Sequence, residues 1–116
     1  MAGNRALSFK YAFEGLITAL KDQPNFKLHL LTAAAVVFAS YFLHISRVDW
    51  LIIILTIGFV VTSELANTAI EEIVDSFTDQ VHPAAKKAKD VAAGAVLIAS
   101  ITAFAIGLII FLPYLI

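Results

Sequence analysis

The residues best suited to chemistry in this sequence are acidic and amide side chains that follow a long apolar run beginning at Trp50. At about 100° per helical residue, Glu64, Glu71 and Asp75 fall within a narrow stripe, and Asn67 lies beside them one turn beyond Glu64. Ionisable groups on a membrane helix are costly, and they usually face the interior of a bundle or a water-filled site. We therefore take these four residues, the polar stripe, as the candidate functional site.

A solvated helix end is the simpler explanation for part of this pattern. It accounts for Asp75, and for Glu72, which points away from the stripe. It does not account for Glu64, because that residue lies within continuous apolar sequence. Glu64 is therefore the member of the stripe that most needs a function.

Carboxylates at a membrane boundary suit a polyanion that is held through a divalent cation. Mg²⁺ typically takes one or two carboxylates together with phosphate oxygens. Lys89 supplies a compact positive charge for phosphates, and Asp90 beside it is either a ligand or the N-cap of the helix that follows. The sequence has no GxxxxGK[ST] loop and no kinase-type glycine loop, so we do not expect a nucleotide fold of the soluble type.

The composition indicates which kind of fold positions these residues. Of the 116 residues 60% are hydrophobic, and the mean hydropathy is +0.89, well above an average soluble domain. We expect an all-α membrane protein that forms a single unit over residues 1–116. A net charge of −1 argues against nucleic acid as a partner, and the lack of cysteine excludes disulfides and Cys-ligated metals. Residues 1–15 lack an uninterrupted apolar core, so we expect no cleavable signal peptide.

Periodicity predicts four helical segments. Apolar residues recur at helical spacing over residues 5–22, with basic residues on the other faces, which is typical of an amphipathic helix at the membrane surface. Spans are expected over residues 27–43, 50–75 and 91–112, joined by polar connections at residues 44–49 and 76–90. Pro24 disfavours helix at Gln23, so residues 22–25 are predicted to form a turn.

The basic residues predict the orientation in the cell membrane. Arg47 lies on one side, and the other basic residues lie on the opposite side: Arg5, Lys10, Lys21, Lys27, Lys86, Lys87 and Lys89. The positive-inside rule places the N-terminus and residues 76–90 in the cytoplasm. The polar stripe then opens toward the compartment that contains ATP.

A longer motif surrounds the stripe and resembles the prokaryotic diacylglycerol kinase/undecaprenol kinase family. The matching residues are Glu64-x-x-Asn67-Thr68-Ala69-Ile70-Glu71-x-x-Val74-Asp75, His82-Pro83 and Ala88-Lys89-Asp90-x-Ala92-Ala93-Gly94-Ala95-Val96. The similarity covers nearly the whole chain, including Tyr11, Gly15 and Asn25-Phe26-x-x-His29. The His-Pro pair and the ending from Gly107 to Pro113 are similar to the Gram-positive branch, whose members favour undecaprenol.

This resemblance implies a homotrimer of three-span subunits that share active sites and use ATP and Mg²⁺. It implies that Glu64 is the general base, that Glu71 binds the metal bridging the ATP phosphates, and that Asn67 holds the base in place. The nucleotide contacts would come from Tyr11, Gln80, Val81, His82, Lys89 and Asp90. The lipid substrate would be flanked by Phe13, Leu20, Phe26, Trp50, Glu64 and Ala93.

The chain departs from the family pattern at two positions. The family has a metal-binding Glu three residues before the position of Phe26, where this chain has Gln23. A Gln carbonyl ligates Mg²⁺ without bringing charge, so we expect lower metal and ATP affinity unless Asp22 or Glu14 compensates. The N-terminal Arg of the family is shifted by one residue, to Arg5, which leaves the role of Arg5 open.

His29 and His44 are expected to be polar residues at the membrane interface rather than metal ligands. No second His or carboxylate stands at metal-ligand spacing from either of them.

The leading functional hypothesis is ATP-dependent phosphorylation of undecaprenol, with diacylglycerol as the alternative lipid. A small ion-conducting subunit, with Glu64 as its carrier site, is an alternative of another class. It leaves Asn67, Glu71, Lys89 and Asp90 without a function. A purely structural membrane subunit is the third alternative, and it predicts that Glu64→Gln affects nothing but stability.

Overall fold

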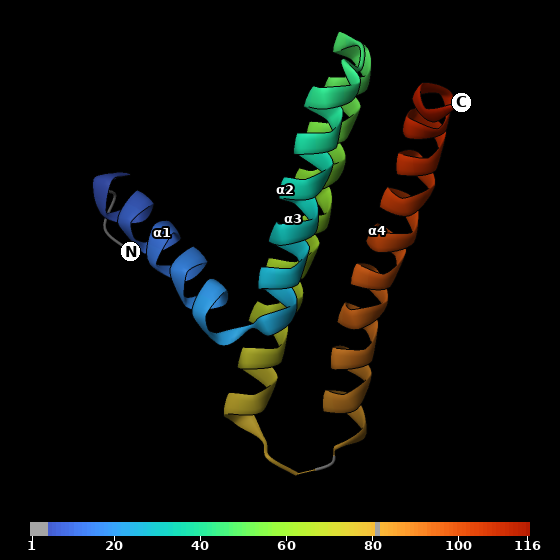
Figure 1. Ribbon diagram of the computed structural model, residues 1–116. Coiled ribbons are helices and arrows are strands. Elements are labelled where there is room, and N and C mark those ends of the chain that lie inside the picture. The colour runs from blue at the N-terminus through green and yellow to red at the C-terminus, as the bar shows by residue number, and fades with distance from the viewer. Residues whose placement is uncertain (1–4, 81) are drawn as a thin grey trace.

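The computed structural model describes residues 5–80 and 82–116, and it is helical almost throughout (Figure 1). The four helices are α1 (Arg5–Asp22), α2 (Pro24–Leu43), α3 (Arg47–Phe77) and α4 (Pro83–Leu115). The last three are each long and apolar enough to cross a membrane. The predicted fold class, an N-terminal helix followed by three membrane helices, is confirmed.

A single residue separates α1 from α2. Gln23 has an extended backbone (φ −118°, ψ 100°), and Pro24 takes the first position of α2, where its missing N–H costs nothing. The predicted turn at residues 22–25 is therefore shorter than expected. Pro24 ends one helix and at once begins the next.

The connection between α2 and α3 is made by two caps. His44 adopts the left-handed conformation (φ 54°), which lets its backbone N–H donate to the carbonyls of Ser40 and Tyr41. Ser46 begins α3, and its side-chain oxygen accepts a hydrogen bond from the Asp49 N–H at 3.1 Å. These local bonds close the hairpin within a few residues.

The connection between α3 and α4 is much shorter than the predicted 76–90. The helix α4 already begins at Pro83, and the His82 ring nitrogen Nδ1 accepts from the Ala84 N–H at 3.1 Å as the N-cap. Of the two alternatives for Asp90, ligand or helix N-cap, the N-cap is therefore wrong, because Asp90 lies inside α4. The charged residues 86–90 sit on the first turns of that helix rather than in a loop.

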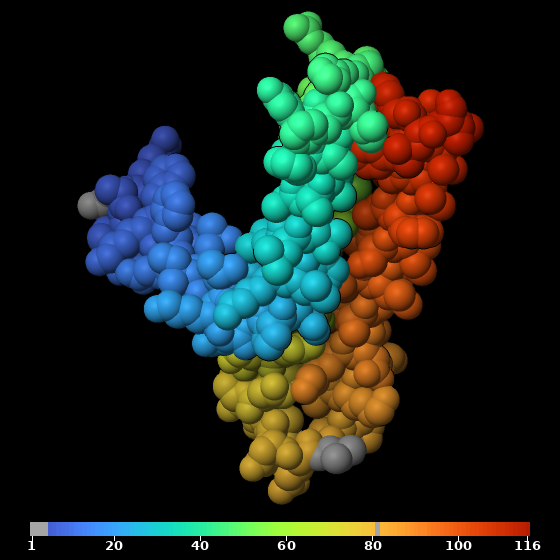
Figure 2. Space-filling view, viewed as in Figure 1, coloured from blue at the N-terminus to red at the C-terminus, as the bar shows by residue number. Residues whose placement is uncertain are grey.

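Helices α3 and α4 pack along one another as an antiparallel pair, and α2 packs against α3. The buried cluster lies near the α2–α3 connection, where Ile45, Ile53 and Ile110 meet and Trp50 packs against them. Helix α1 packs against α2 near their junction, and its N-terminal part diverges from the other three helices (Figures 1 and 2).

Helix lengths place the polar residues relative to the membrane. At 1.5 Å per residue, α2 is about 30 Å long, while α3 and α4 reach about 46 and 50 Å. Only the length of α2 matches the thickness of the hydrocarbon core of a membrane, which is about 30 Å. The longer pair extends together beyond the α1–α2 junction, as Figure 1 shows at the α3–α4 connection. The polar stripe lies toward this end of α3.

Most large apolar side chains are exposed in the isolated chain. Leu55 on α3 and Ile109 on α4 are 75% and 73% exposed. Such a surface is unfavourable in water and is what a membrane helix presents to lipid or to neighbouring helices. Lipid or further subunits must therefore cover these helices.

Candidate active site

Glu64 is buried and has a partner on the neighbouring helix. Its side chain is 10% exposed, and its Oε1 lies 2.9 Å from Nε2 of His29 on α2. The residue pattern predicted a polar interface position for His29 and did not predict this contact. A signal was present: α2 and α3 are antiparallel, and both residues lie at similar distances along the chain from the connection at Ile45.

Asn67 and Glu71 form the next layer of the polar stripe. The Asn67 amide Nδ2 donates to Glu71 Oε1 at 3.2 Å. Asn67 Oδ1 is buried and has no hydrogen-bond partner within residues 5–80 and 82–116. A buried amide oxygen without a partner is unfavourable, so this atom calls for a ligand or a neighbouring group.

The last member of the stripe faces α4. Asp75 Oδ1 accepts from the Lys89 ammonium at 2.9 Å, and Lys86 Nζ lies 2.6 Å from Asp90 Oδ2 on the same α4 surface. Three of these four side chains are well exposed, and exposed ion pairs contribute little stability. The charges remain accessible to a ligand at this end of the molecule.

The donor set fits Mg²⁺ only in company with phosphate. In the described part of the chain, no three acidic or histidine side chains are arranged to hold a metal ion by themselves. Glu71 and the unpartnered Asn67 Oδ1 do offer hard oxygen ligands close together. Mg²⁺ is commonly bound in this way, with one or two protein oxygens and the rest from phosphates and water.

Gln23 lies at a different place from the stripe. It lines a crevice of about 650 Å³ between the end of α1 and α3, together with Asp22, Thr68 and Glu72. Glu72 is the acidic residue that helical periodicity places off the stripe, and the crevice brings it near Gln23. Within one chain, therefore, Gln23 shares a crevice with Glu72 rather than with Glu71.

The remaining predicted nucleotide contacts are spread along the chain. Tyr11 is 54% exposed on the diverging part of α1. Gln80 lies in the α3–α4 connection, where its N–H donates to Thr78 Oγ1 at 3.1 Å, and His82 caps α4. Val81 lies outside the described residues.

The predicted lipid-flanking residues also occupy separate places. Phe13 and Leu20 are exposed on α1, Phe26 is buried near the start of α2, and Ala93 is exposed on α4. Trp50 lies at the opposite end of α3 from the polar stripe, packed against the buried cluster. One chain does not bring these residues to a common point.

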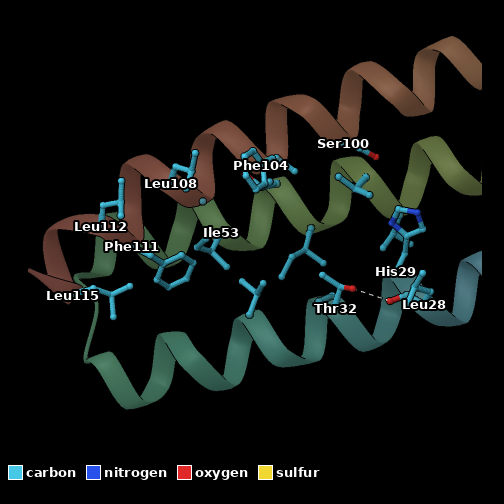
Figure 3. Close-up of a pocket in the computed structure, with 18 residues that line it drawn as sticks. Leu28, His29, Thr32, Ile53, Ser100, Phe104, Leu108, Phe111, Leu112 and Leu115 are labelled. Atoms are coloured by element: carbon cyan, nitrogen blue, oxygen red, sulfur yellow. Dashed lines mark hydrogen bonds between the residues drawn. The ribbon is translucent and has the colours of Figure 1, made fainter.

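An apolar cleft of about 520 Å³ runs between α2, α3 and α4. Figure 3 shows His29 and Leu28 at one end and Leu112 and Leu115 at the other. Its lining is almost wholly aliphatic and aromatic, with few polar groups. His29 therefore contacts the buried carboxylate Glu64 and also lines this cleft.

Comparison with known proteins gives a consistent result. The family described as prokaryotic diacylglycerol kinase matches residues 10–111. An undecaprenol kinase of Bacillus subtilis is 44% identical over 93% of this chain and 88% of that protein. A diacylglycerol kinase of Synechocystis is 42% identical over 97% of this chain and 65% of its own length, and one of Escherichia coli K12 is 29% identical over 80% and 76%.

The names of this family and of these relatives indicate a lipid kinase, which confirms the predicted class of enzyme. The matched region contains the whole polar stripe and the Lys89–Asp90 pair. On the extent of the family match, the chain belongs to the prokaryotic diacylglycerol kinase family.

Proposed function

We propose that this protein transfers the γ-phosphate of ATP to the hydroxyl group of a membrane lipid, with undecaprenol as the substrate and diacylglycerol as the alternative. The observation that carries the proposal is the polar stripe on α3. It runs from the buried Glu64 to Asn67 and Glu71, toward the charged end of α3 and α4. The 44% identity to an undecaprenol kinase supports the choice of lipid.

Glu64 is the proposed general base. It lies in the apolar part of α3, one turn from the first polar neighbour of the stripe, which is where the hydroxyl of a membrane lipid meets the polar region. Its carboxylate takes the hydroxyl proton, the lipid oxygen bonds to the γ-phosphorus, and the bond to the bridging oxygen breaks to release ADP. A base in this role must lie within hydrogen-bond reach of the proton.

Glu71 is the proposed ligand of Mg²⁺, which would supply charge neutralisation for the ATP phosphates. Asn67, which the resemblance assigns to holding the base in place, bonds instead to Glu71, and its Oδ1, unpartnered within the described residues, is proposed as a second ligand. Lys89 and Asp90 on α4 are proposed to contact the nucleotide, together with Tyr11, Gln80, Val81 and His82. Phosphoryl transfer depends mainly on positioning and charge stabilisation, so such a set of short-range contacts is sufficient. Gln23 is proposed as a further, uncharged metal ligand, as the family pattern implies.

The lipid is proposed to lie along the helices with its hydroxyl at Glu64. Phe13, Leu20, Phe26 and Ala93 would flank it near the polar end. Trp50 lies about 21 Å farther along α3 at 1.5 Å per residue, where it would flank the hydrocarbon chain of either lipid.

A homotrimer in the cytoplasmic membrane, with the N-terminus and the active site facing the cytoplasm, completes the proposal. Two features of the isolated chain favour an assembly. Predicted site residues on α1 and α3 are dispersed within one chain, and α1 diverges from the other helices (Figure 1). Active sites shared between neighbouring subunits bring such dispersed residues together.

The test is phosphate transfer from γ-labelled ATP in mixed micelles with Mg²⁺, offering undecaprenol and diacylglycerol separately. We expect label in undecaprenol and a loss of at least 100-fold in the Glu64→Gln variant, because general-base catalysis contributes about 10²–10⁴-fold. Melting temperatures with and without ATP check that the variant folds and still binds nucleotide.

Three other results would change the conclusion. Preferential labelling of diacylglycerol would keep the mechanism and replace the substrate. No labelling of either lipid, even after Gln23→Glu, would contradict the kinase proposal. A fully active Glu64→Gln variant would contradict the role of that residue and leave the enzyme class intact.

A further inference from the structure

We propose that His29 is a positioning residue for the reaction, one that holds the carboxylate of Glu64 in the orientation from which it accepts the lipid proton. This inference rests on the proposed function of Glu64 as the base. It starts from the contact of 2.9 Å between His29 Nε2 and Glu64 Oε1, which joins α2 to α3.

The chemistry of the two groups fixes the direction of the hydrogen bond. An ionised carboxylate has only acceptor oxygens, so the imidazole Nε2 must carry the hydrogen. This holds both for the neutral Nε2–H tautomer and for the imidazolium ion. The bond occupies one oxygen of Glu64 and leaves Oε2 available for the hydroxyl proton.

The hydrogen bond between His29 and Glu64 is stronger than one on the surface, because both side chains are largely shielded from water. The side chain of Glu64 is 10% exposed and that of His29 is 29% exposed. His29 also lines the apolar cleft, with Leu28 and Thr32 around it (Figure 3). Hydrogen bonds to charged groups are stronger where water is excluded, and a buried carboxylate without a donor is unfavourable.

A glutamate on a helix has several rotatable bonds, and without a partner its carboxylate samples several orientations. His29 stands on a different helix, so its N–H restricts the carboxylate from outside α3. Catalysis is sensitive to misplacement of a reacting group by about 1 Å. Loss of the donor is therefore expected to lower kcat while leaving ATP binding, which takes place farther along the stripe, unchanged.

The test compares three variants of the full-length protein in mixed micelles containing undecaprenol. His29→Leu removes the donor and keeps similar volume. His29→Gln keeps an N–H donor at about the same reach, and Thr32→Val is the matched control, because Thr32 lines the same cleft and its hydroxyl donates to the Leu28 carbonyl. Melting temperatures identify any variant that fails to fold.

We expect His29→Leu to lower kcat by about 10- to 100-fold, the factor for losing a hydrogen bond to a charged group. The KM for ATP should stay within about twofold of the unmodified protein. His29→Gln should recover most of the rate, and Thr32→Val should match the unmodified protein.

Equal loss in the Leu and Gln variants, or a change confined to KM, would show that His29 has only a structural role. An unchanged kcat in His29→Leu would overturn the inference while leaving the kinase proposal intact. No transferase activity toward either lipid, in the unmodified protein and in Gln23→Glu alike, would overturn both. If His29→Leu does not fold, His29→Met replaces it as the variant without an N–H donor, and the same outcomes decide.

Discussion

At the scale of single residues, the members of the polar stripe make three separate side-chain contacts. Glu64 faces α2 through His29, Asn67 and Glu71 bond to each other, and Asp75 faces α4 through Lys89. The same face of α3 therefore meets α2 at Glu64 and α4 at Asp75. This arrangement separates the buried carboxylate proposed as the base from the exposed charges proposed to contact the nucleotide.

Gln23 offers the clearest residue-scale prediction. Replacing it with Glu should lower the KM for ATP–Mg²⁺ by roughly 30-fold, because one added unit charge about 4 Å from a divalent cation contributes about 2 kcal/mol in a water-like medium. Gln23→Met, which removes the oxygen, should raise the KM. Steady-state kinetics at varied Mg²⁺ concentration measure all three proteins.

We expect the affinity for ATP–Mg²⁺ to be highest with Glu at position 23, lower with Gln and lowest with Met. Equal KM values for the three proteins would exclude Gln23 as a metal ligand. The crevice that Gln23 shares with Glu72 would then be unrelated to ATP binding.

At the scale of elements, different side-chain contacts join α3 to α4 at the two ends of the helix pair. At the charged end, Lys89 bonds to Asp75. At the other end, the Tyr114 hydroxyl donates to Asp49 Oδ2 at 2.7 Å and accepts from the Ser46 N–H at 3.0 Å. The second set ties the last turn of α4 to the first turn of α3, away from the proposed site.

Tyr114→Phe should therefore lower stability without lowering activity. It removes two hydrogen bonds, one of them to a carboxylate, and we expect a loss of about 1–2 kcal/mol in the free energy of unfolding. Thermal unfolding in detergent, followed by the fluorescence of the single tryptophan, Trp50, measures the change.

Tyr41→Phe is the control for that experiment. Tyr41 is 71% exposed, and its hydroxyl makes no hydrogen bond recorded within the described residues. It should unfold like the unmodified protein. Equal stability of both variants would show that the bonds of Tyr114 contribute nothing.

At the scale of the whole molecule, the apolar surface and the charge distribution decide how the protein sits in its environment. Large side chains such as Leu55 and Ile109 point outward from the helices. Basic residues gather on α1, on the start of α2 and on the first turns of α4, with only Arg47 at the other end. A membrane covers the exposed apolar side chains, and the distribution of basic residues predicts the orientation of the protein in that membrane.

Single cysteines test that orientation directly, because the chain has no cysteine of its own. In intact spheroplasts, a membrane-impermeant maleimide should label Arg47→Cys and leave Lys87→Cys unlabelled. Lysis should expose both, since both residues are exposed in the structure. The reverse pattern would place the polar stripe outside the cytoplasm and contradict the use of cytoplasmic ATP.

The sequence by itself determined the fold class, the polar stripe and the family. Hydropathy and helical periodicity are local properties, so three spans and a surface helix followed from them, and the stripe followed from residue spacing on one helix. The sequence did not predict where α4 begins. His82 is the N-cap and Pro83 the first residue of this helix, which therefore starts before its apolar residues do.

Only the tertiary structure decided which helix each polar residue faces. That His29 meets Glu64 depends on the register of α2 against α3, and that Lys89 meets Asp75 depends on the register of α4. Register is set by packing between helices, which periodicity within one helix does not contain. For the same reason, the crevice at Gln23 and the apolar cleft emerged only once the helices were placed together.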